Sequence, residues 1–254
     1  MLNLFNPRQM AWTTPAGATY NLFRDMLRQP HLLIAGATGS GKSVLENGLI
    51  VTALYDSPAR VNFIMVDPKR VELVRYRSLP HVIRYASEPA DMVTALQSAL
   101  NITEQRYREM QRRRMTRYAG GPEIYVIIDE LAALMTTAKK AVLPILQRLG
   151  MIARAAGVHM IACTQTVKAD VLPTTLTCNF DSRVALRTST AQQSRMIIDR
   201  PGCELFPSPT VSGRAQCAYR TGADLTIWNV PYVTEAEADR LIAWWTDKRH
   251  RSRF

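Results

Sequence analysis

One stretch of the sequence combines glycines, a lysine and a serine at the spacing of a loop that could cradle phosphate. Residues 36–43 read Gly-Ala-Thr-Gly-Ser-Gly-Lys-Ser, the pattern GxxxxGKS. Glycines let the backbone curl so that several N–H groups point at phosphate oxygens, and the following helix adds a positive dipole. The pattern therefore predicts a nucleotide site, with Lys42 at the β- and γ-phosphates and the Ser43 hydroxyl on Mg²⁺. The predicted nucleotide-binding residues are Gly36, Ala37, Thr38, Gly39, Ser40, Gly41, Lys42 and Ser43.

Two acidic residues, Asp129 and Glu130, directly follow the apolar run 124–128 (Ile-Tyr-Val-Ile-Ile). In P-loop enzymes a carboxylate at a strand end holds the Mg²⁺ shell, and a neighbouring acid can orient or deprotonate water. We therefore expect Asp129 to be a second metal ligand and Glu130 to act on the attacking water. The structural alternative for this pair is a helix N-cap.

A glutamine follows another apolar run. Gln165 comes just after residues 158–163 (Val-His-Met-Ile-Ala-Cys), where a polar side chain can sense the γ-phosphate and relay its loss to moving loops. An ordinary surface glutamine is the alternative. With Lys42, Asp129 and Glu130, Gln165 completes the catalytic residues predicted from the residues alone.

The elements that must position these side chains alternate between strand and helix. Apolar strands that alternate with helices predict an α/β fold with a mostly parallel sheet and helices on both faces. Ligands of such sheets bind at the carboxyl ends of the strands, where all the residues above are placed. The expected strands are 31–35, 61–66, 124–128 and 158–163, with 184–186 and 215–219 as further candidates; the expected helices follow Lys42, run from Pro89 to about 115, cover 139–156, and run from 234 to about 247.

Composition and charge bound the class of protein. The chain has 254 residues, with 32 Lys and Arg against 21 Asp and Glu, for a net charge of +11. Such a charge favours a polyanion or an anionic membrane as partner, although a basic protein without either is the alternative. The four cysteines (163, 178, 203 and 217) form no CxxC pair, and we interpret them as reduced thiols of a cytoplasmic protein. Because the sequence has no secretory leader pattern and no run of about 20 apolar residues, we expect no transmembrane segment and attachment to a membrane only through a partner. We expect one domain over 1–254, with a lead-in at 1–30 and a basic tail at 248–254.

The segments together resemble the FtsK/SpoIIIE branch of the FtsK/HerA DNA-pumping ATPases, over about residues 28–240. This combination is more specific than the phosphate loop and the acidic pair alone. Within it, Asp67 ends a strand and is expected to help shape the nucleotide site. The matching segments are 30–36, which leads into the loop; 66–69 with Glu72 and Leu73, similar to DPK…EL; 128–132 with Leu134 and Met135, similar to DE(L/F)ADLM; 154–159, similar to RAAGIH; Thr164 and Gln165, similar to ATQ; and Asn179, Ser182, Arg183, Ser194, Arg195 and Asp199 in order.

The resemblance implies a RecA-like P-loop NTPase core that uses ATP and Mg²⁺. It also implies a homohexameric ring with nucleotide between subunits and double-stranded DNA in the pore. Arg154 would then be the finger that reaches the γ-phosphate of a neighbouring subunit, with Arg148 as a second candidate. A cation placed favourably at a helix C-terminus is the alternative for Arg154.

The chain departs from the family pattern where DNA contact is expected. Ala133 replaces an aspartate, Thr166 and Val167 replace Arg-Pro, and Thr177 and Ala191 stand where the larger translocases tend to have lysines. Other cations could compensate by contacting DNA phosphates, or could be solvated surface groups. These tentative DNA-binding residues are Lys168, Arg183, Arg187 and Arg195.

The predicted function is an ATP-dependent, ring-forming motor on double-stranded DNA. Because no transmembrane region precedes the motor and no winged-helix reader follows it, we expect service to a plasmid, conjugative or phage-like element. One alternative is a nucleotide-binding coupling protein that recruits a DNA–protein complex to a secretion channel. Another is a secretion ATPase that moves polypeptide with the same fold.

Overall fold

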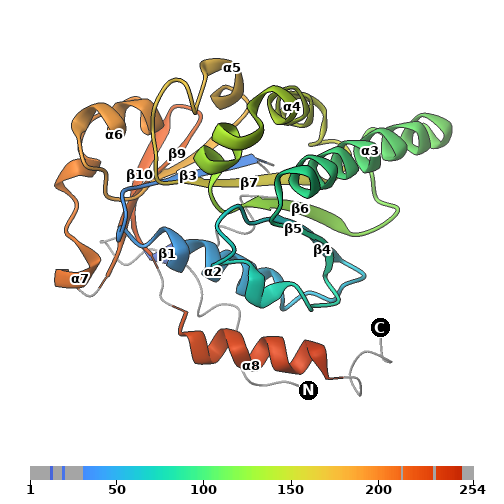
Figure 1. Ribbon diagram of the computed structural model, residues 1–254, viewed down its shortest axis with the longest axis horizontal. Coiled ribbons are helices and arrows are strands. Elements are labelled where there is room, and N and C mark those ends of the chain that lie inside the picture. The colour runs from blue at the N-terminus through green and yellow to red at the C-terminus, as the bar shows by residue number, and fades with distance from the viewer. Residues whose placement is uncertain (1–11, 14–18, 21–30, 213, 231–232, 248–254) are drawn as a thin grey trace.

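Six parallel strands form one side of the sheet in the computed structural model, and antiparallel strands continue it on the other side (Figure 1). The structure describes residues 12–13, 19–20, 31–212, 214–230 and 233–247. The order across the sheet is β2-β1-β10-β9-β8-β3-β7-β6-β4-β5, and the segment from β8 to β5 is parallel. The strands are β1 (Trp12–Thr13), β2 (Thr19–Tyr20), β3 (His31–Ala35), β4 (Val61–Val66), β5 (Val82–Ala86), β6 (Glu123–Ile128), β7 (Val158–Thr164), β8 (Ser182–Ala185), β9 (Gln216–Thr221) and β10 (Asp224–Asn229).

Helices cover both faces of this sheet (Figure 1). The pair α3 (Pro89–Arg113) and α4 (Leu131–Ile152) packs on one face, and the pair α2 (Lys42–Ala53) and α8 (Glu235–Thr246) packs on the other. The predicted α/β architecture with a mostly parallel sheet is therefore confirmed. The shorter helical elements are η2 (Val74–Tyr76), α5 (Thr174–Thr177), α6 (Ala191–Ile198), η3 (Cys203–Leu205) and α7 (Pro209–Ser212).

The central strands are buried on both sides, which explains their continuous apolar runs. Along β3, Leu33 packs into the cluster under α3 and α4, whereas Leu32 and Ile34 pack into the cluster under α2. Successive side chains of a strand point to opposite faces, so a strand covered on both faces needs apolar residues at every position. The sheet thus holds the ends of β3, β6 and β7 in a fixed relation.

Helix α4 differs from its predicted range of 139–156. It begins at Leu131 and ends at Ile152, with non-helical backbone at Ala138 (φ −138°). The hydroxyls of Thr136 and Thr137 donate to carbonyl oxygens four residues earlier, a type of contact that bends helices. The predicted start coincided with the kink, and the first two turns, which begin directly after Glu130, were not anticipated.

The antiparallel part of the sheet was only half predicted. Strand β9 was expected, but β10 pairs with it across a two-residue loop in which Gly222 has φ 58°. At the far end of the chain, α8 begins near the predicted residue 234, with a capping box of Thr234 and Glu237. Among the described residues, no helix combines the length and apolar character needed to cross a membrane. The lead-in at 1–30 lies mostly, and the basic tail at 248–254 wholly, outside the described residues.

Candidate nucleotide site

The loop between β3 and α2 has the backbone geometry of an anion cradle. Gly39 (φ 73°) and Gly41 (φ 95°) adopt the left-handed region that side chains disfavour. At Gly36 a Cβ atom would lie 2.5 Å from the hydroxyl of Ser40 and 2.7 Å from Leu186, so the close approach of these chains requires glycine. Helix α2 begins at Lys42, so its amino-terminal N–H groups face the loop as predicted.

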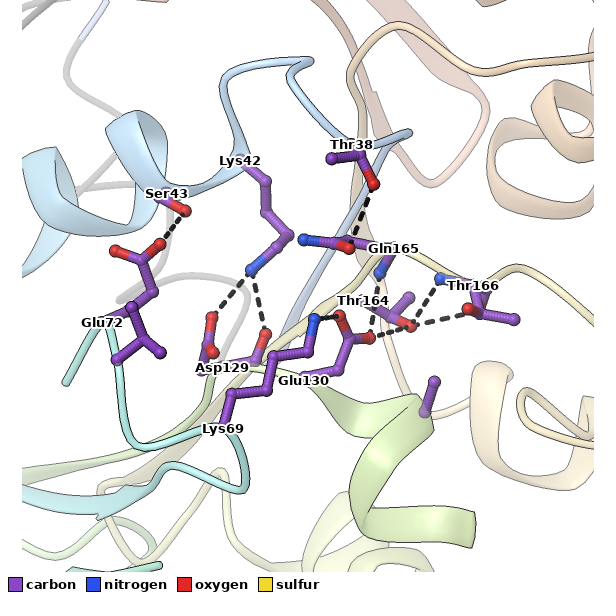
Figure 2. Close-up of polar contacts among 12 residues, drawn as sticks. Thr38, Lys42, Ser43, Lys69, Glu72, Asp129, Glu130, Thr164, Gln165 and Thr166 are labelled. Carbon is purple, nitrogen blue, oxygen red and sulfur yellow. Dashed lines mark hydrogen bonds and ion pairs between the residues drawn. The ribbon is translucent and has the colours of Figure 1, made fainter.

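Lys42 and Asp129 meet directly. The Nζ atom of Lys42 donates to Asp129 Oδ1 at 2.8 Å and to the main-chain oxygen of Asp129 at 3.0 Å, and both residues are buried. Burial alone would lower the pKa of Lys42, but Cys163, Glu46 and Asp129 around it together raise that pKa above its ordinary value. The structure therefore brings the predicted phosphate ligand and the predicted metal ligand together as a charged pair (Figure 2).

Glu130 is held by donors on both of its carboxylate oxygens. Its Oε1 accepts from the Thr164 hydroxyl and from the main-chain N–H of Gln165, each at 2.9 Å. Its Oε2 forms an ion pair with Lys69 Nζ at 2.9 Å. The side chain of Gln165 also joins the site, because its Oε1 accepts from the Thr38 hydroxyl of the glycine loop at 3.3 Å. Four predicted catalytic residues thus lie at one edge of the sheet (Figure 2).

The hydroxyl of Ser43 is oriented by a second acid. Ser43 Oγ donates to Glu72 Oε1 at 2.7 Å, which leaves the lone pairs of the hydroxyl oxygen available to a cation. Hydroxyl and carboxylate oxygens suit Mg²⁺, which in such sites takes its other ligands from substrate phosphates and water. Over the described part of the chain, no three His, Cys, Asp or Glu side chains cluster as a metal site by themselves. Ser43 and Asp129 therefore fit an ion that arrives with nucleotide.

Sequence reasoning missed the roles of four residues at this edge. Lys69 and Glu72 contact Glu130 and Ser43, and Thr164 contacts Glu130. The signal for the first two was present, since the DPK…EL segment directly follows β4, a neighbour of β6. The signal for Thr164 was its place before Gln165. For Glu46 on α2, an acid within an apolar helix face, no motif or spacing indicated a place in the site.

Glu46 is a buried acid beside the charged pair. It lies one turn after Lys42 on α2, is 2% exposed, and within the described structure neither of its carboxyl oxygens has a hydrogen-bond partner. Burial raises the pKa of Glu46 well above its ordinary value, against the opposing effect of Lys42. The site therefore contains a buried carboxyl group that favours the neutral form beside the ion pair of Lys42 and Asp129.

Arg154 lies at the opposite edge of the sheet from this site. It stands in the turn between α4 and the amino end of β7, and its side chain is exposed. The pKa of His31, the first residue of β3, is lowered to about 3 by burial and, to a smaller extent, by the nearby His159 and Arg154. Because Arg154 affects His31, it lies close to the amino ends of β3 and β7. Since Lys42 follows the carboxyl end of β3, Arg154 cannot serve the site of its own chain. Arg148, the second candidate, pairs with Glu104 at 3.2 Å.

The four candidate DNA-binding residues lie in different surroundings. Lys168 and Arg195 are exposed. Arg187 lies beside the glycine loop, since its main-chain oxygen accepts from Ala37 N at 2.8 Å. Arg183 instead donates to three main-chain oxygens, those of Phe180, Thr177 and Ile197, and burial lowers its pKa. The structure therefore gives Arg183 a role in holding the chain together around β8.

Comparison with known proteins identifies the family. The profile of the FtsK/SpoIIIE family matches residues 15–123 and 113–169, together more than half of the chain. The chain belongs to the FtsK/SpoIIIE family. The resemblance inferred from the DPK, DELA and RAAGVH segments is thereby confirmed.

FtsK/SpoIIIE relatives align with most of this chain. The DNA translocase FtsK of Lactococcus lactis is 42% identical over 200 residues, which are 71% of this chain and 26% of that protein. The DNA translocase FtsK of Campylobacter jejuni is 34% identical over 241 residues, which are 89% of this chain and 25% of that protein. The chain thus spans about a quarter of the length of these curated relatives.

Solved structures show the same fold at lower identity. The cytoplasmic domain of the type VII secretion ATPase EccC of Thermomonospora curvata has a TM-score of 0.78 and 21% identity, over 96% of this chain and 32% of that one. The pCW3 conjugation coupling protein TcpA, in a monomer form with ATPγS, has a TM-score of 0.74 and 22% identity, over 86% of this chain and 66% of that one. By family and fold, this FtsK/SpoIIIE member is a P-loop ATPase domain.

Proposed function

We propose that this chain hydrolyses ATP with Mg²⁺ and uses the free energy to move along double-stranded DNA, as a homohexameric ring with nucleotide bound between neighbours. The observation that supports it most directly is the division of the predicted catalytic residues between two edges of the sheet. Lys42, Asp129, Glu130 and Gln165 meet at the carboxyl edge, whereas the exposed Arg154 lies at the amino edge. A complete site then needs a second subunit.

The roles of these residues follow from their contacts. N–H groups of residues 36–43 and the ammonium of Lys42 bind the phosphates of ATP. Ser43 and Asp129 would hold Mg²⁺, which would neutralise charge on the phosphate oxygens. Glu130 accepts a proton from the attacking water, whose oxygen bonds to the γ-phosphorus as the bond to the bridging oxygen of ADP breaks. Gln165, whose side chain accepts a hydrogen bond from Thr38 and which lies next to Glu130, senses the γ-phosphate. Arg154 of the neighbouring subunit neutralises the charge of the transition state.

Double-stranded DNA is the proposed track. The relatives that are 34–42% identical are named DNA translocases, whereas the secretion ATPase is 21% identical and its likeness concerns the fold alone. A net charge of +11 suits contacts with DNA phosphates, which depend on salt and select sequence weakly. Of the tentative DNA contacts, we favour the exposed Lys168 and Arg195.

The cellular setting forms the finer part of the proposal. We place the chain in the cytoplasm, where any contact with a membrane or a secretion channel would be made through a partner. Service to a plasmid, conjugative or phage-like element remains a prediction from the sequence.

The test is the steady-state ATPase rate with and without linear duplex DNA at two salt concentrations. We expect DNA to stimulate the wild type, salt to reduce the stimulation, and Lys42→Ala and Glu130→Gln to abolish turnover. The control Lys140→Ala removes an exposed lysine of α4 and should leave the rate unchanged. A Mg²⁺-dependent rate indifferent to DNA, or no turnover at all, would refute the motor and favour a coupling module; stimulation by polypeptide instead would favour a secretion ATPase.

A further inference from the structure

Residues 67–73 form a loop that contacts both ends of the candidate nucleotide site. Lys69 Nζ binds Glu130 Oε2 at 2.9 Å, and three residues later Glu72 Oε1 accepts from the Ser43 hydroxyl at 2.7 Å. In Figure 2 both side chains reach toward the site from this one loop, on either side of the pair formed by Lys42 and Asp129. The loop is therefore placed to respond to whatever binds between them.

The base of the loop is firmly built. Asp67 is fully buried, and its carboxylate accepts from the main-chain N–H groups of Val71 at 3.4 Å and Leu73 at 3.2 Å. The hydroxyl of Tyr85 also donates to Asp67, at 3.2 Å. Arg70 turns the chain with φ 59°. A change in the position of Lys69 can thus occur at its long side chain while the loop backbone stays in place.

The two partners of the Lys69–Glu130 pair differ in their surroundings. The side chain of Lys69 is 40% exposed and that of Glu130 is 4% exposed, so the lysine is the member that faces solvent. Glu130 is fixed on its other oxygen by Thr164 and Gln165. An ammonium group has three donors, so Lys69 can bind a second anion or exchange one anion for another. Moving Lys69 uncovers Glu130 Oε2.

We propose that Lys69 is a positioning residue that holds Glu130 in place until ATP binds, and whose ammonium group then transfers to the γ-phosphate, leaving Glu130 Oε2 free for the attacking water. A buried carboxylate without a cation is unfavourable, so Lys69 stabilises Glu130 while no ATP is bound. The γ-phosphate is the anion that distinguishes ATP from ADP. After phosphate release, the same lysine returns to Glu130. Glu130 is thus free to act on water only while ATP occupies the site.

The closing experiment measures nucleotide affinity, because it reports on Lys69 without turnover. We expect Lys69→Ala to weaken binding of the non-hydrolysable analogue AMP-PNP by about tenfold or more, as for loss of a hydrogen bond from a charged donor. Binding of ADP should change by less than about twofold, because ADP lacks the γ-phosphate. Without nucleotide, the same variant should melt about 2–4 °C lower, because Glu130 loses its cation and the pair is only partly buried. Lys69→Arg should restore most of the preference for AMP-PNP over ADP.

A matched control and two outcomes decide the matter. Arg70→Asn removes the next cation of the same loop, which pairs with Glu88 where both side chains are exposed, and asparagine accepts the left-handed backbone there. The affinities of this variant should match those of the wild type. If Lys69→Ala loses affinity equally for AMP-PNP and ADP, the lysine is merely structural and the proposal is wrong. The proposal is also wrong if the affinities for both nucleotides stay as in the wild type. If Lys69→Ala does not fold, Lys69→Gln replaces it in the same comparison.

This inference rests on the proposed use of ATP but not on DNA. A wild-type chain that binds neither AMP-PNP nor ADP would refute the proposed function itself. A wild-type chain that binds both, with Lys69 variants that do not distinguish them, would refute only the transfer of Lys69.

Discussion

Replacing Glu46 with methionine should stabilise the chain. Glu46 lies on α2 beside Lys42, Asp129 and the buried Cys163, and both of its carboxyl oxygens are buried without a hydrogen-bond partner in the described structure. Methionine has a similar length, is flexible, and has no group that requires a partner. The substitution therefore removes an unfavourable feature of the folded state.

The magnitude follows from the cost of an unsatisfied buried polar group. That cost is about 1–3 kcal/mol, so the free energy of unfolding should rise by about that amount in Glu46→Met. For a domain of this size, each kcal/mol shifts the melting temperature by about 2–4 °C, so the rise should be about 2–12 °C. Thermal and urea unfolding of wild type and variant, measured without nucleotide, would give both quantities.

The effect should depend on pH in a defined direction. Burial raises the pKa of Glu46 in the folded chain above its ordinary value of 4.5, so the folded state keeps a proton that the unfolded chain releases. The stability that this proton contributes is complete below pH 4.5 and is lost as the pH rises through the raised folded value. The advantage of Glu46→Met over the wild type should therefore grow as the pH increases above about 4.5.

A destabilised Glu46→Met variant would refute this reasoning. It would mean that Glu46 is charged in the folded chain and that its attraction to Lys42 outweighs the cost of burial. The control Glu104→Met makes the same change on the exposed side of α3, where the pair with Arg148 contributes little. Its melting temperature should stay close to that of the wild type at every pH.

Three further predictions concern the site and its surroundings. Arg154→Ala should lower kcat by about 10³–10⁵, and mixing it with Glu130→Gln subunits should restore turnover, because each supplies what the other lacks; mixtures that stay inactive would argue against a shared site. Glu72→Gln should raise the Mg²⁺ concentration needed for half-maximal ATPase activity by about 10–100-fold, since Ser43 loses its charged acceptor; an unchanged Mg²⁺ titration would show that Glu72 does not orient Ser43. Arg183→Met should lower the free energy of unfolding by about 1.5–3 kcal/mol without altering DNA affinity, whereas Lys168→Ala should weaken DNA binding and leave unfolding unchanged; the reverse pattern would exchange their roles.

The predicted part of the site depended on residues whose place is fixed by the central strands. Asp129 and Gln165 directly follow buried strands, Lys42 follows one through the glycine loop, and parallel strands bring their carboxyl ends to one edge. Each motif and the strand before it were therefore enough to predict that these residues lie close together. The strands themselves were found because both of their faces are covered, which leaves an unbroken apolar signal.

The contacts that could not be predicted depend on loop conformation. Lys69 reaches Glu130 because the buried carboxylate of Asp67 folds residues 68–73 back over the site, and no periodic pattern encodes such a loop. Strand β5 was missed for a different reason. It is an edge strand whose Arg84 faces solvent, so it lacks the continuous apolar run of its neighbour β4. For α4, the predicted start at residue 139 fell directly after the kink at Ala138, so the turns before the kink were missed.

Because Arg154 and the phosphate loop lie at opposite edges of the sheet, the two edges of each subunit differ in the groups that they offer to a neighbour. In a head-to-tail arrangement, the edge that carries Arg154 in one copy faces the edge that carries the phosphate loop of the next copy, so every site has the same surroundings. With the role proposed for Arg154, such a head-to-tail contact either closes into a ring or continues as a helical filament. The rotation between successive copies, rather than any single side chain, would then decide which of these two assemblies forms.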